Sequence, residues 1–214
     1  MSLRVQVEEA FRAEFGAEPE AVIRAPGRVN LIGEHTDYND GYVLPMAIDR
    51  AIWLAIRSRD DRSVHVHSLQ QSDACEFSLD ELSPGASGWS EYLKGMAKFL
   101  QEEGHKLVGW DGVMSGDIPM ASGLSSSAAI EMAVGLAFAE LSKFPFDGMV
   151  MARIGQRVEN DWIGAKTGIM DQMICANGKA GSALLLDCRN LTSQPIALPS
   201  NSVVFVLDTM TRHD

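Results

Sequence analysis

A charged turn near the start of the 214-residue sequence holds side chains suited to gripping a small polar ligand. Arg28, Glu34, His35 and Asp37 fall within ten positions of one another. Carboxylates and histidine suit sugar recognition, because each sugar hydroxyl both donates and accepts a hydrogen bond. The arginine could hold a transferred phosphoryl group or lower the pKa of a neighbouring carboxylic acid. The alternative is a solvated turn with local side-chain to backbone hydrogen bonds.

A second stretch, residues 116–130, is rich in serine and other small residues. It contains Gly123, Leu124, Ser125, Ser126 and Ser127 in succession. Small residues let the backbone approach a ligand, and a following helix would aim its free N–H groups at the loop. Hydroxyls can also donate to phosphate oxygens or ligate Mg²⁺. The Gly-Lys-Ser/Thr ending of a Walker A loop is missing, and a capping serine with small-residue helix packing is the alternative.

A third candidate stretch contains two acidic residues. Glu159 is expected late in a helix, and Asp171 follows it twelve positions later. Ile169, Met170 and Met173 flank Asp171, so this carboxyl is expected to be partly desolvated, as catalytic carboxyls often are. A helix-capping aspartate among ordinary methionine packing is the alternative.

Helices and strands must bring these stretches together. Apolar spacing predicts helices at 3–15, 90–103, 126–142 and 147–161, with a short helix around Asp171. Strands are predicted at 20–25, 42–58, 62–68, 107–116, 182–187 and 203–208. Their irregular interleaving predicts an α+β fold. Alternation at 63–67 places His65 and His67 on one strand face, where a solvated face is favoured over a metal site because no third ligand is near.

Composition limits the functional classes. Hydrophobic residues make up 46% of the chain and charged residues 22%, which is typical of a soluble globular protein. The net charge of −11 argues against a nucleic-acid partner. The longest apolar stretch, 128–141, is too short and too charged to span a membrane. The N-terminus does not resemble a secretory signal, and three cysteines without CxxC spacing indicate reduced thiols, so a cytoplasmic protein is expected.

Taken together, these stretches resemble the galactokinase branch of the GHMP kinases, the superfamily named for galactose, homoserine, mevalonate and phosphomevalonate. Residues 27–38, Gly-Arg-Val-Asn-Leu-Ile-Gly-Glu-His-Thr-Asp-Tyr, match the galactokinase signature throughout. Residues 119–129 are similar to the phosphate-binding loop of the superfamily. Residues 168–172, Gly-Ile-Met-Asp-Gln, match its catalytic-aspartate stretch, and residues 185–189 resemble the strand after it. The resemblance covers residues 20–214.

The resemblance implies a GHMP-kinase N-terminal domain, a ribosomal protein S5 domain 2-like fold in which helices pack on a mixed sheet. It assigns residues 1–198 to that sugar- and ATP-binding domain and residues 199–214 to the start of an incomplete C-terminal domain. Family members are nearly twice as long. Their third, Gly-rich motif and a downstream tyrosine used at the sugar have no counterpart in this sequence, so self-association through an exposed apolar face is expected.

The resemblance also implies an activity, the ATP-dependent phosphorylation of D-galactose at its C1 hydroxyl to give galactose 1-phosphate. Asp171 would be the base, or the charge, that faces this hydroxyl, with Arg28 beside it. Glu34, His35 and Asp37 would bind galactose hydroxyls, and Asp37 would read the axial C4 hydroxyl. Related sugar 1-kinases acting on N-acetylgalactosamine, arabinose or a uronic acid, and a non-catalytic galactose sensor, are the alternatives.

ATP and Mg²⁺ are the implied cofactors. The residues implied to bind ATP are Gly123, Leu124, Ser125, Ser126, Ser127 and, near the adenine, Trp89. Ser127 and Glu159 would hold the metal, and Gly168 would lie at the sugar. Trp89 and the nearby Tyr92 could instead be ordinary core aromatics. Galactose and ATP are the expected partners, with no nucleic acid or membrane, and the full-length protein is expected to be monomeric.

Two positions depart from the family pattern. Ala121 stands where a glycine is more common, and Thr167 stands where cysteine or serine is more common. Both residues are small, so both departures are expected to be tolerated.

Overall fold

The computed structural model describes residues 1–85, 88–119 and 122–207. Its strands are β1 (Ala21–Asn30), β2 (Tyr42–Val43), β3 (Pro45–Ser58), β4 (Ser63–Ser68), β5 (Asp73–Ser78), β6 (Trp110–Gly116), β7 (Ser182–Asp187) and β8 (Thr192–Ala197). Its helices are α1 (Leu3–Phe15), α2 (Ser90–Glu102), α3 (Ser126–Ser142), α4 (Gly148–Arg157) and α5 (Met170–Asn177). A 3₁₀ turn, η1 (Asp37–Asn39), and a π-helical segment, η2 (Val158–Ile163), complete them.

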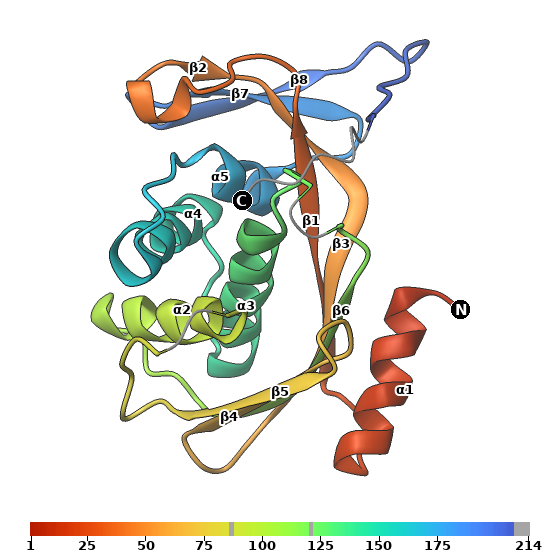
Figure 1. Cartoon of the computed structure of the whole chain (residues 1–214), viewed down its shortest axis with the longest axis vertical. Helices are drawn as coiled ribbons and strands as arrows, with labels where there is room; N and C mark the ends of the chain where they lie inside the picture. Colours follow the sequence, from red (N-terminus) through yellow and green to blue (C-terminus); the bar gives the residue numbers. More distant parts are fainter. Residues whose placement is uncertain (86–87, 120–121, 208–214) are drawn as a thin grey trace.

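The strands form one mixed sheet, which confirms the expected α+β class. Strand order is β2-β7-β3-β6-β4-β5, with β1 also paired to β3 and β8 to β7. β4 and β6 are parallel, and the other pairs are antiparallel. In Figure 1 the sheet curves around α2, α3, α4 and α5, while α1 covers its opposite face.

Side chains of β3 alternate between the two faces of the sheet. Ile52, Leu54 and Ile56 are buried in the main core under the four helices. Ala55 points the other way and packs with Phe11 of α1 in a smaller cluster. Because strand side chains have a period of two, one strand can serve two layers at once.

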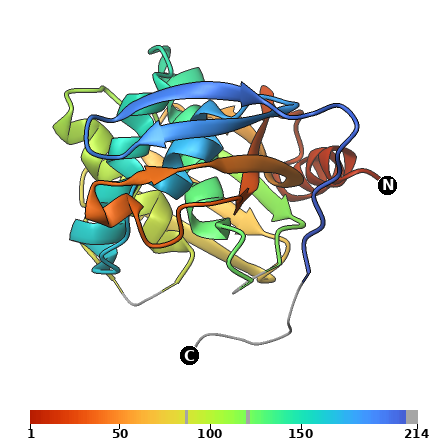
Figure 2. The same cartoon turned by 90° about the horizontal axis from the view of Figure 1, so that it is seen from above.

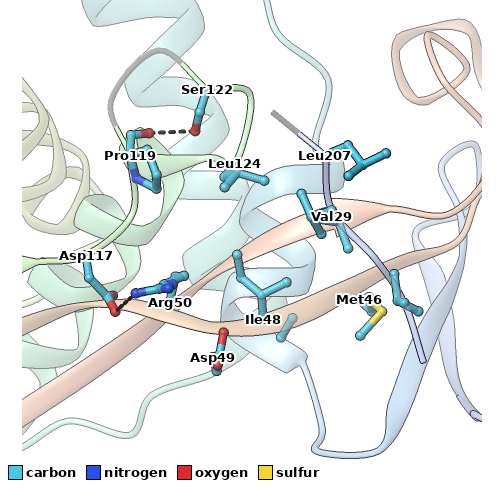
Figure 3. Close-up of a pocket in the computed structure, with 13 residues that line it drawn as sticks. Val29, Met46, Ile48, Asp49, Arg50, Asp117, Pro119, Ser122, Leu124 and Leu207 are labelled. Atoms are coloured by element: carbon cyan, nitrogen blue, oxygen red, sulfur yellow. Dashed lines mark hydrogen bonds and ion pairs between the residues drawn. The ribbon is translucent and has the colours of Figure 1, made fainter. Parts of the chain in front are cut away.

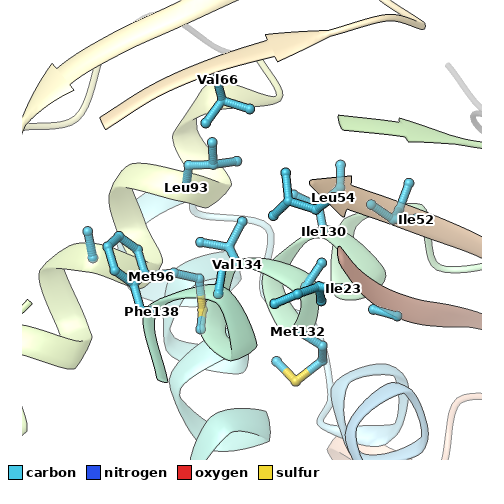
Figure 4. Packing of buried hydrophobic residues seen from close by; sticks show 14 of the residues in the cluster. Ile23, Ile52, Leu54, Val66, Leu93, Met96, Ile130, Met132, Val134 and Phe138 are labelled. Atoms are coloured by element: carbon cyan, nitrogen blue, oxygen red, sulfur yellow. The ribbon is translucent and has the colours of Figure 1, made fainter. Parts of the chain in front are cut away.

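Helix α3 runs through the main core and is apolar on nearly every side. Figure 4 shows residues of the sheet, α2 and α3 packed together, among them Ile23, Leu54, Val66, Leu93, Met96, Val134 and Phe138. A helix that is apolar all round is typically buried on every side. Gly135 lets α2 and α4 approach it, because a Cβ there would lie 2.9 Å from Met96 Cε. This packing fixes the N-terminal end of α3, where the serine-rich loop ends.

A second core lies between β7 and α5. Met173 and Ile174 of α5 pack against Leu184 and Leu186 of β7. Figure 2 shows β7 and β8 side by side, with α5 close to them. The backbone N–H of Cys188 donates to the carbonyl of Gly41 at 3.0 Å. These contacts bring the charged turn next to α5, although the two segments are far apart in the sequence.

Most predicted elements agree with the structure, but the strand predicted at 20–25 continues to Asn30. Residues 27–30, expected in the charged turn, therefore lie in β1, and residues 28–30 pair with β3. The pairing register shifts between Pro26 and Arg28. The span 42–58 divides into β2 and β3, and the 107–116 strand starts only at Trp110.

Three further differences concern strands and one concerns a helix. β5 and β8 were not expected. The strand predicted at 203–208 is wrong for residues 203–207, which have no regular structure and pair with no strand, and residue 208 lies outside the described residues. An apolar run has the composition of a strand, but it forms one only where the edge of another strand accepts and donates its backbone hydrogen bonds. The helix predicted at 147–161 ends as α4 at Arg157 and continues as η2.

β4 alternates as expected. Val64 and Val66 are buried, while His65 and His67 share the more open face. His65 Nε2 lies 3.0 Å from Glu76 Oε1. Within the described ranges, no three His, Cys, Asp or Glu side chains cluster as a metal site would require. Over the same ranges, no helix has the length and apolar character of a membrane span.

Candidate active site

Arg28 and Asp171 form a two-pronged ion pair at the centre of the site. They are 143 positions apart, Arg28 on β1 and Asp171 in the first turn of α5. Arg28 Nε donates to Asp171 Oδ1 at 2.7 Å, and Nη2 donates to Oδ2 at 2.6 Å. The side chains are 13% and 28% exposed, so the carboxylate is held from one side and open from another. Such a bidentate pair fixes the plane of the carboxylate.

The serine-rich loop closes on this pair. Ser125 Oγ donates a hydrogen bond to Asp171 Oδ2, and Arg28 Nη1 donates to the carbonyl of Gly123. The backbone N–H of Arg28 also donates to the carbonyl of Leu124 at 3.1 Å. The structure therefore brings together the predicted arginine, the predicted aspartate and the predicted phosphate loop.

Two backbone features allow this close approach. A Cβ at position 27 would lie 2.7 Å from the carbonyl oxygen of Leu124, so the loop can dock on β1 only because Gly27 has no side chain. Ser125 adopts a left-handed conformation, with φ of 60°, immediately before α3. That conformation is costly for a residue other than glycine and is typical of sites where function fixes the backbone.

The loop opens onto a cavity of about 340 Å³. Residues 122–127 line it, together with Arg28, Tyr92, Pro119 and Asp171. The first N–H groups of α3 have no partner within the helix, and they carry the positive end of its dipole. A cavity with these donors and an arginine suits a phosphate chain. Ala121 lies outside the described residues.

Glu159 and Ser127 meet beside this cavity. Ser127 Oγ donates to Glu159 Oε1 at 2.8 Å, and Thr167 Oγ1 donates to Glu159 Oε2. Glu159 is only 7% exposed. Hydroxyl and carboxylate oxygens are the hard ligands that Mg²⁺ prefers, and Mg²⁺ commonly combines one or two carboxylates with substrate phosphates. The donor set therefore fits the expected magnesium ion.

The π-helical segment η2 presents Glu159 to the site. A π turn inserts an extra residue into a helix and is frequent at functional sites. Asn160, next along the segment, accepts the N–H of Thr167 at 2.6 Å and donates to its carbonyl at 3.2 Å. The departure noted at Thr167 thus has a structural role, because its backbone and hydroxyl tie the loop before α5 to η2. Sequence spacing carried no signal for this contact.

Asp37 joins the charged turn to α5. A Cβ at position 168 would collide with the Asp37 carboxylate, so Gly168 makes room for it. Burial raises the pKa of Asp37, and the nearby charge of Asp171 raises that pKa further. Hydrogen bonds from the backbone of Tyr38 and Met170 act in the opposite direction on this pKa. Two of the predicted acids therefore share one electrostatic environment.

Glu34 and His35 lie on the same turn but are exposed. Asn30 Nδ2 donates to Glu34 Oε2 at 3.0 Å, and Tyr38 Oη lies 2.5 Å from His35 Nδ1. His35 has a φ of 61°, in the left-handed region, which histidine enters more often than most residues other than glycine. These side chains remain free to contact a ligand on their outer side.

The two aromatic residues at the start of α2 differ in position. Tyr92 lines the cavity, and burial together with the charge of Glu159 raises its pKa. Trp89 is half-buried against the main core and is not among the residues that line the cavity. Of the pair, Tyr92 alone is in position to touch a molecule in this cavity.

A larger cavity of about 670 Å³ lies on the other side of the loop (Figure 3). Its walls are mainly apolar, with Val29, Met46 and Leu207 among them. Two acids line it: Asp117 is paired with Arg50 Nη1 at 3.0 Å, while Asp49 is exposed. Unlike the smaller cavity, the larger one is lined neither by Asp171 nor by the serines at the start of α3.

Two family models match the chain. The "Galactokinase galactose-binding signature" matches residues 9–58, and "GHMP kinases N terminal domain" matches residues 91–179. The galactokinase of Chloroflexus aggregans (strain MD-66 / DSM 9485) is 48% identical over 205 residues, which are 95% of this chain and 53% of that protein. The galactokinase of Roseiflexus sp. (strain RS-1) is 44% identical over 95% of this chain and 52% of its own length.

Solved structures agree with these matches. Lactococcus lactis galactokinase complexed with galactose superposes with a TM-score of 0.87 at 36% identity, over 92% of this chain and 52% of that one. Methanococcus jannaschii mevalonate kinase superposes with a TM-score of 0.69 at 23% identity, over 82% of this chain and 55% of that one, which bears on the fold alone. The fold is that of a GHMP-kinase N-terminal domain. Within that superfamily the chain is similar to the N-terminal portion of galactokinases, and it spans about half the length of the relatives it matches.

Proposed function

We propose that the complete protein is a galactokinase that transfers the γ-phosphoryl group of ATP to the C1 hydroxyl of D-galactose. The observation that carries this proposal is the contact of Arg28 with both Asp171 and the serine-rich loop. This contact holds the Asp171 carboxylate, which suits the acceptor hydroxyl, next to the serine-rich loop, which suits the phosphates of the donor. The structural match to a galactokinase complexed with galactose supports the sugar.

In the proposed reaction, Asp171 accepts the proton of the C1 hydroxyl, and the C1 oxygen bonds to the γ-phosphorus. The bond from that phosphorus to the β–γ bridging oxygen breaks, and ADP leaves. The transition state of such transfers is loose, so positioning and charge neutralisation contribute more than covalent chemistry. Arg28 fixes Asp171 and offers positive charge to the moving phosphoryl group.

The loop holds the phosphates. Backbone N–H groups at the start of α3, that of Ser125 included, and the hydroxyl of Ser126 would donate to phosphate oxygens, while the Ser125 hydroxyl stays on Asp171. Ser127 and Glu159 would hold Mg²⁺, which when bound neutralises negative charge on the β- and γ-phosphates. Tyr92, on the cavity wall, would contact the nucleotide, and Trp89 would lie further out towards the adenine.

Sugar recognition falls to the charged turn. Glu34, His35 and Asp37 would bind galactose hydroxyls, with Gly168 leaving room between Asp37 and α5. Asp37 would bind the C4 hydroxyl, whose axial position separates galactose from glucose. The charged turn is exposed, whereas Arg28 and Asp171 are held in place. A different sugar could bind to the turn without a change in this pair, so a related sugar 1-kinase is the second candidate.

Other features of the complete protein follow from this proposal. Residues 1–198 would be the sugar- and ATP-binding domain, and residues 199–214 would begin a second domain. The residues at 203–207 are apolar and exposed, Phe205 by 83%, as expected of a segment that another part of the protein covers. We further propose a cytoplasmic, monomeric enzyme with no nucleic-acid or membrane partner.

The test is a coupled ADP-release assay on the complete protein. Galactose-dependent ADP release, with little release on glucose or N-acetylgalactosamine, is the expected result. If ADP release is faster with N-acetylgalactosamine, arabinose or a uronic acid than with galactose, that sugar is the substrate and the galactose assignment is wrong. Tight galactose and ATP binding without any ADP release would identify a sensor and overturn the kinase proposal.

A further inference from the structure

A buried acid behind the catalytic carboxylate has no place in the proposed reaction. Glu131 lies on α3, and Gln172, the residue after Asp171, lies on α5. Both residues are 0% exposed. Gln172 Nε2 donates a hydrogen bond to Glu131 Oε2 at 3.1 Å, which links the two helices.

The remaining polar atoms of these side chains pose a problem. Glu131 Oε1 and Gln172 Oε1 are both buried, and neither has a hydrogen-bond partner among the described residues. An ionised carboxylate accepts hydrogen bonds only, so it cannot satisfy the amide oxygen. Leaving a buried acceptor without a hydrogen bond destabilises the folded state. One proton on Glu131 Oε1 would satisfy both oxygens, because a carboxylic acid and an amide have complementary donors and acceptors.

The surroundings also disfavour a charge at this position. Burial raises the pKa of Glu131 well above its ordinary value, and the charge of Glu159 raises that pKa further. Asp171 contributes in the same direction, and the hydrogen bond from Gln172 opposes them. Glu159, on η2, and Asp171, on α5, are thus the charged groups that act on Glu131.

We propose that an un-ionised Glu131 forms a closed acid–amide pair with Gln172, and that this pair positions Asp171. In this pair the amide of Gln172 donates to Glu131 Oε2, and Glu131 Oε1–H donates to Gln172 Oε1. Glu131 is a positioning residue and has no direct contact with substrate. The positioning role rests on the proposed kinase function, whereas the pairing does not.

Helix packing supports a positioning role for the pair. α5 has only eight residues, and Ile169 at its N-cap makes no capping hydrogen bond through its side chain. Glycine at position 155 of α4 lets that helix close on the pair, because a Cβ there would lie 2.8 Å from Glu131 Oε2 and 2.9 Å from Gln172 Cγ. The pair therefore sits where α3, α4 and α5 meet, one residue from Asp171.

Infrared difference spectroscopy on the complete protein tests the pairing without any need for activity. At neutral pH, wild type minus Glu131→Gln should show the carbonyl stretching band of one protonated carboxyl group, and this band should shift when Gln172 is replaced by Met. Absence of the band would mean that Glu131 is ionised and would overturn the pair.

Kinetics of matched variants test the positioning role. Glu131→Gln keeps a complementary amide pair and should keep kcat within about twofold. Glu131→Met leaves Gln172 unpaired at similar volume and should lower kcat by up to about 10²-fold, as small misplacements of a catalytic group do. KM for both substrates should change little.

The positioning role is wrong if Glu131→Gln lowers kcat as much as Glu131→Met does, or if Glu131→Met raises KM and leaves kcat unchanged. A complete protein without sugar-kinase activity would refute the proposed function, while the infrared band would still decide the pairing.

Discussion

The two sides of the site are built differently. On the proposed phosphate side, Ser125 and Glu159 are 8% and 7% exposed, and their side chains are tied to other elements by hydrogen bonds. On the proposed sugar side, Glu34 and His35 lie exposed on a turn held mainly by its own residues. Transfer of a phosphoryl group depends on preorganised charge, which needs a rigid and partly dry setting. Sugar recognition can be supplied by loop residues, whose replacement leaves the interior intact.

Asp171→Asn in the complete protein should give the largest effect. Asparagine cannot accept the proton, and it meets Arg28 with an amide nitrogen in place of one carboxylate oxygen. General-base loss typically costs 10²–10⁴-fold, so kcat should fall by about 10³-fold or more. Galactose affinity, measured by calorimetry, should stay within a few-fold of wild type. Near-normal turnover would show that Asp171 has been given the wrong role.

Gly168→Ala should disrupt the junction between the two sides. The added Cβ would collide with the Asp37 carboxylate, so the turn or α5 must move. Overpacking of this kind costs about 1–3 kcal/mol in the free energy of unfolding. Chemical denaturation would measure that loss, and calorimetry should show weaker galactose binding. Gly181→Ala is a matched control, because a Cβ there meets nothing within 4 Å and only its positive φ opposes the change. Equal galactose binding in both variants would contradict the proposed contact.

Asp37→Asn separates binding from stability. The folded state raises the pKa of Asp37, so ionisation of Asp37 destabilises the folded state. This cost is complete above the folded-state pKa, falls as pH drops through it and vanishes below the pKa of the unfolded carboxyl. Asparagine should therefore make the complete protein more stable than wild type at neutral pH, with the difference shrinking towards the pKa of the unfolded carboxyl. Galactose affinity should nevertheless fall, because one carboxylate acceptor is lost.

Thermal unfolding across a pH series measures this difference, and Asp40→Asn on the same turn is its control. A variant that is less stable than wild type at neutral pH would show that the backbone hydrogen bonds of Asp37 outweigh its desolvation. Unchanged galactose affinity would remove Asp37 from the sugar site.

The three stretches that the sequence singled out meet in the structure, and they could be singled out because local patterns carry their residue types. The N-terminal start of α3 after small residues and the acid in the first turn of α5 are both local features. The contacts between stretches were harder to foresee. Ser125 meets Asp171 only because β1, α3 and α5 converge, and no spacing in the chain encodes that meeting.

The same distinction explains the missed elements. β8 is an exposed edge strand whose polar residues, such as Gln194 and Ser193, lack the apolar alternation that predicts a strand. The run at 203–207 has a strand-like composition but pairs with no strand in the described part of the chain. The π segment at Glu159 is a shift of helical hydrogen bonding that residue types alone do not reveal.

Thr167 offers the smallest and most selective change on the phosphate side. Its hydroxyl donates to Glu159 Oε2, while Ser127 holds the other oxygen of that carboxylate. Thr167→Val removes the hydroxyl at nearly constant shape, and a hydrogen bond to a charged group contributes about 1.5–3 kcal/mol. Since Glu159 would then be held by Ser127 alone, the Mg²⁺ concentration for half-maximal activity should rise, by about tenfold for a lost supporting contact. Thr167→Ser keeps the hydroxyl and should match wild type. If the valine variant has a normal Mg²⁺ dependence but a raised KM for galactose, Thr167 serves the sugar side, and the boundary between the two regions would have to move to include the loop before α5.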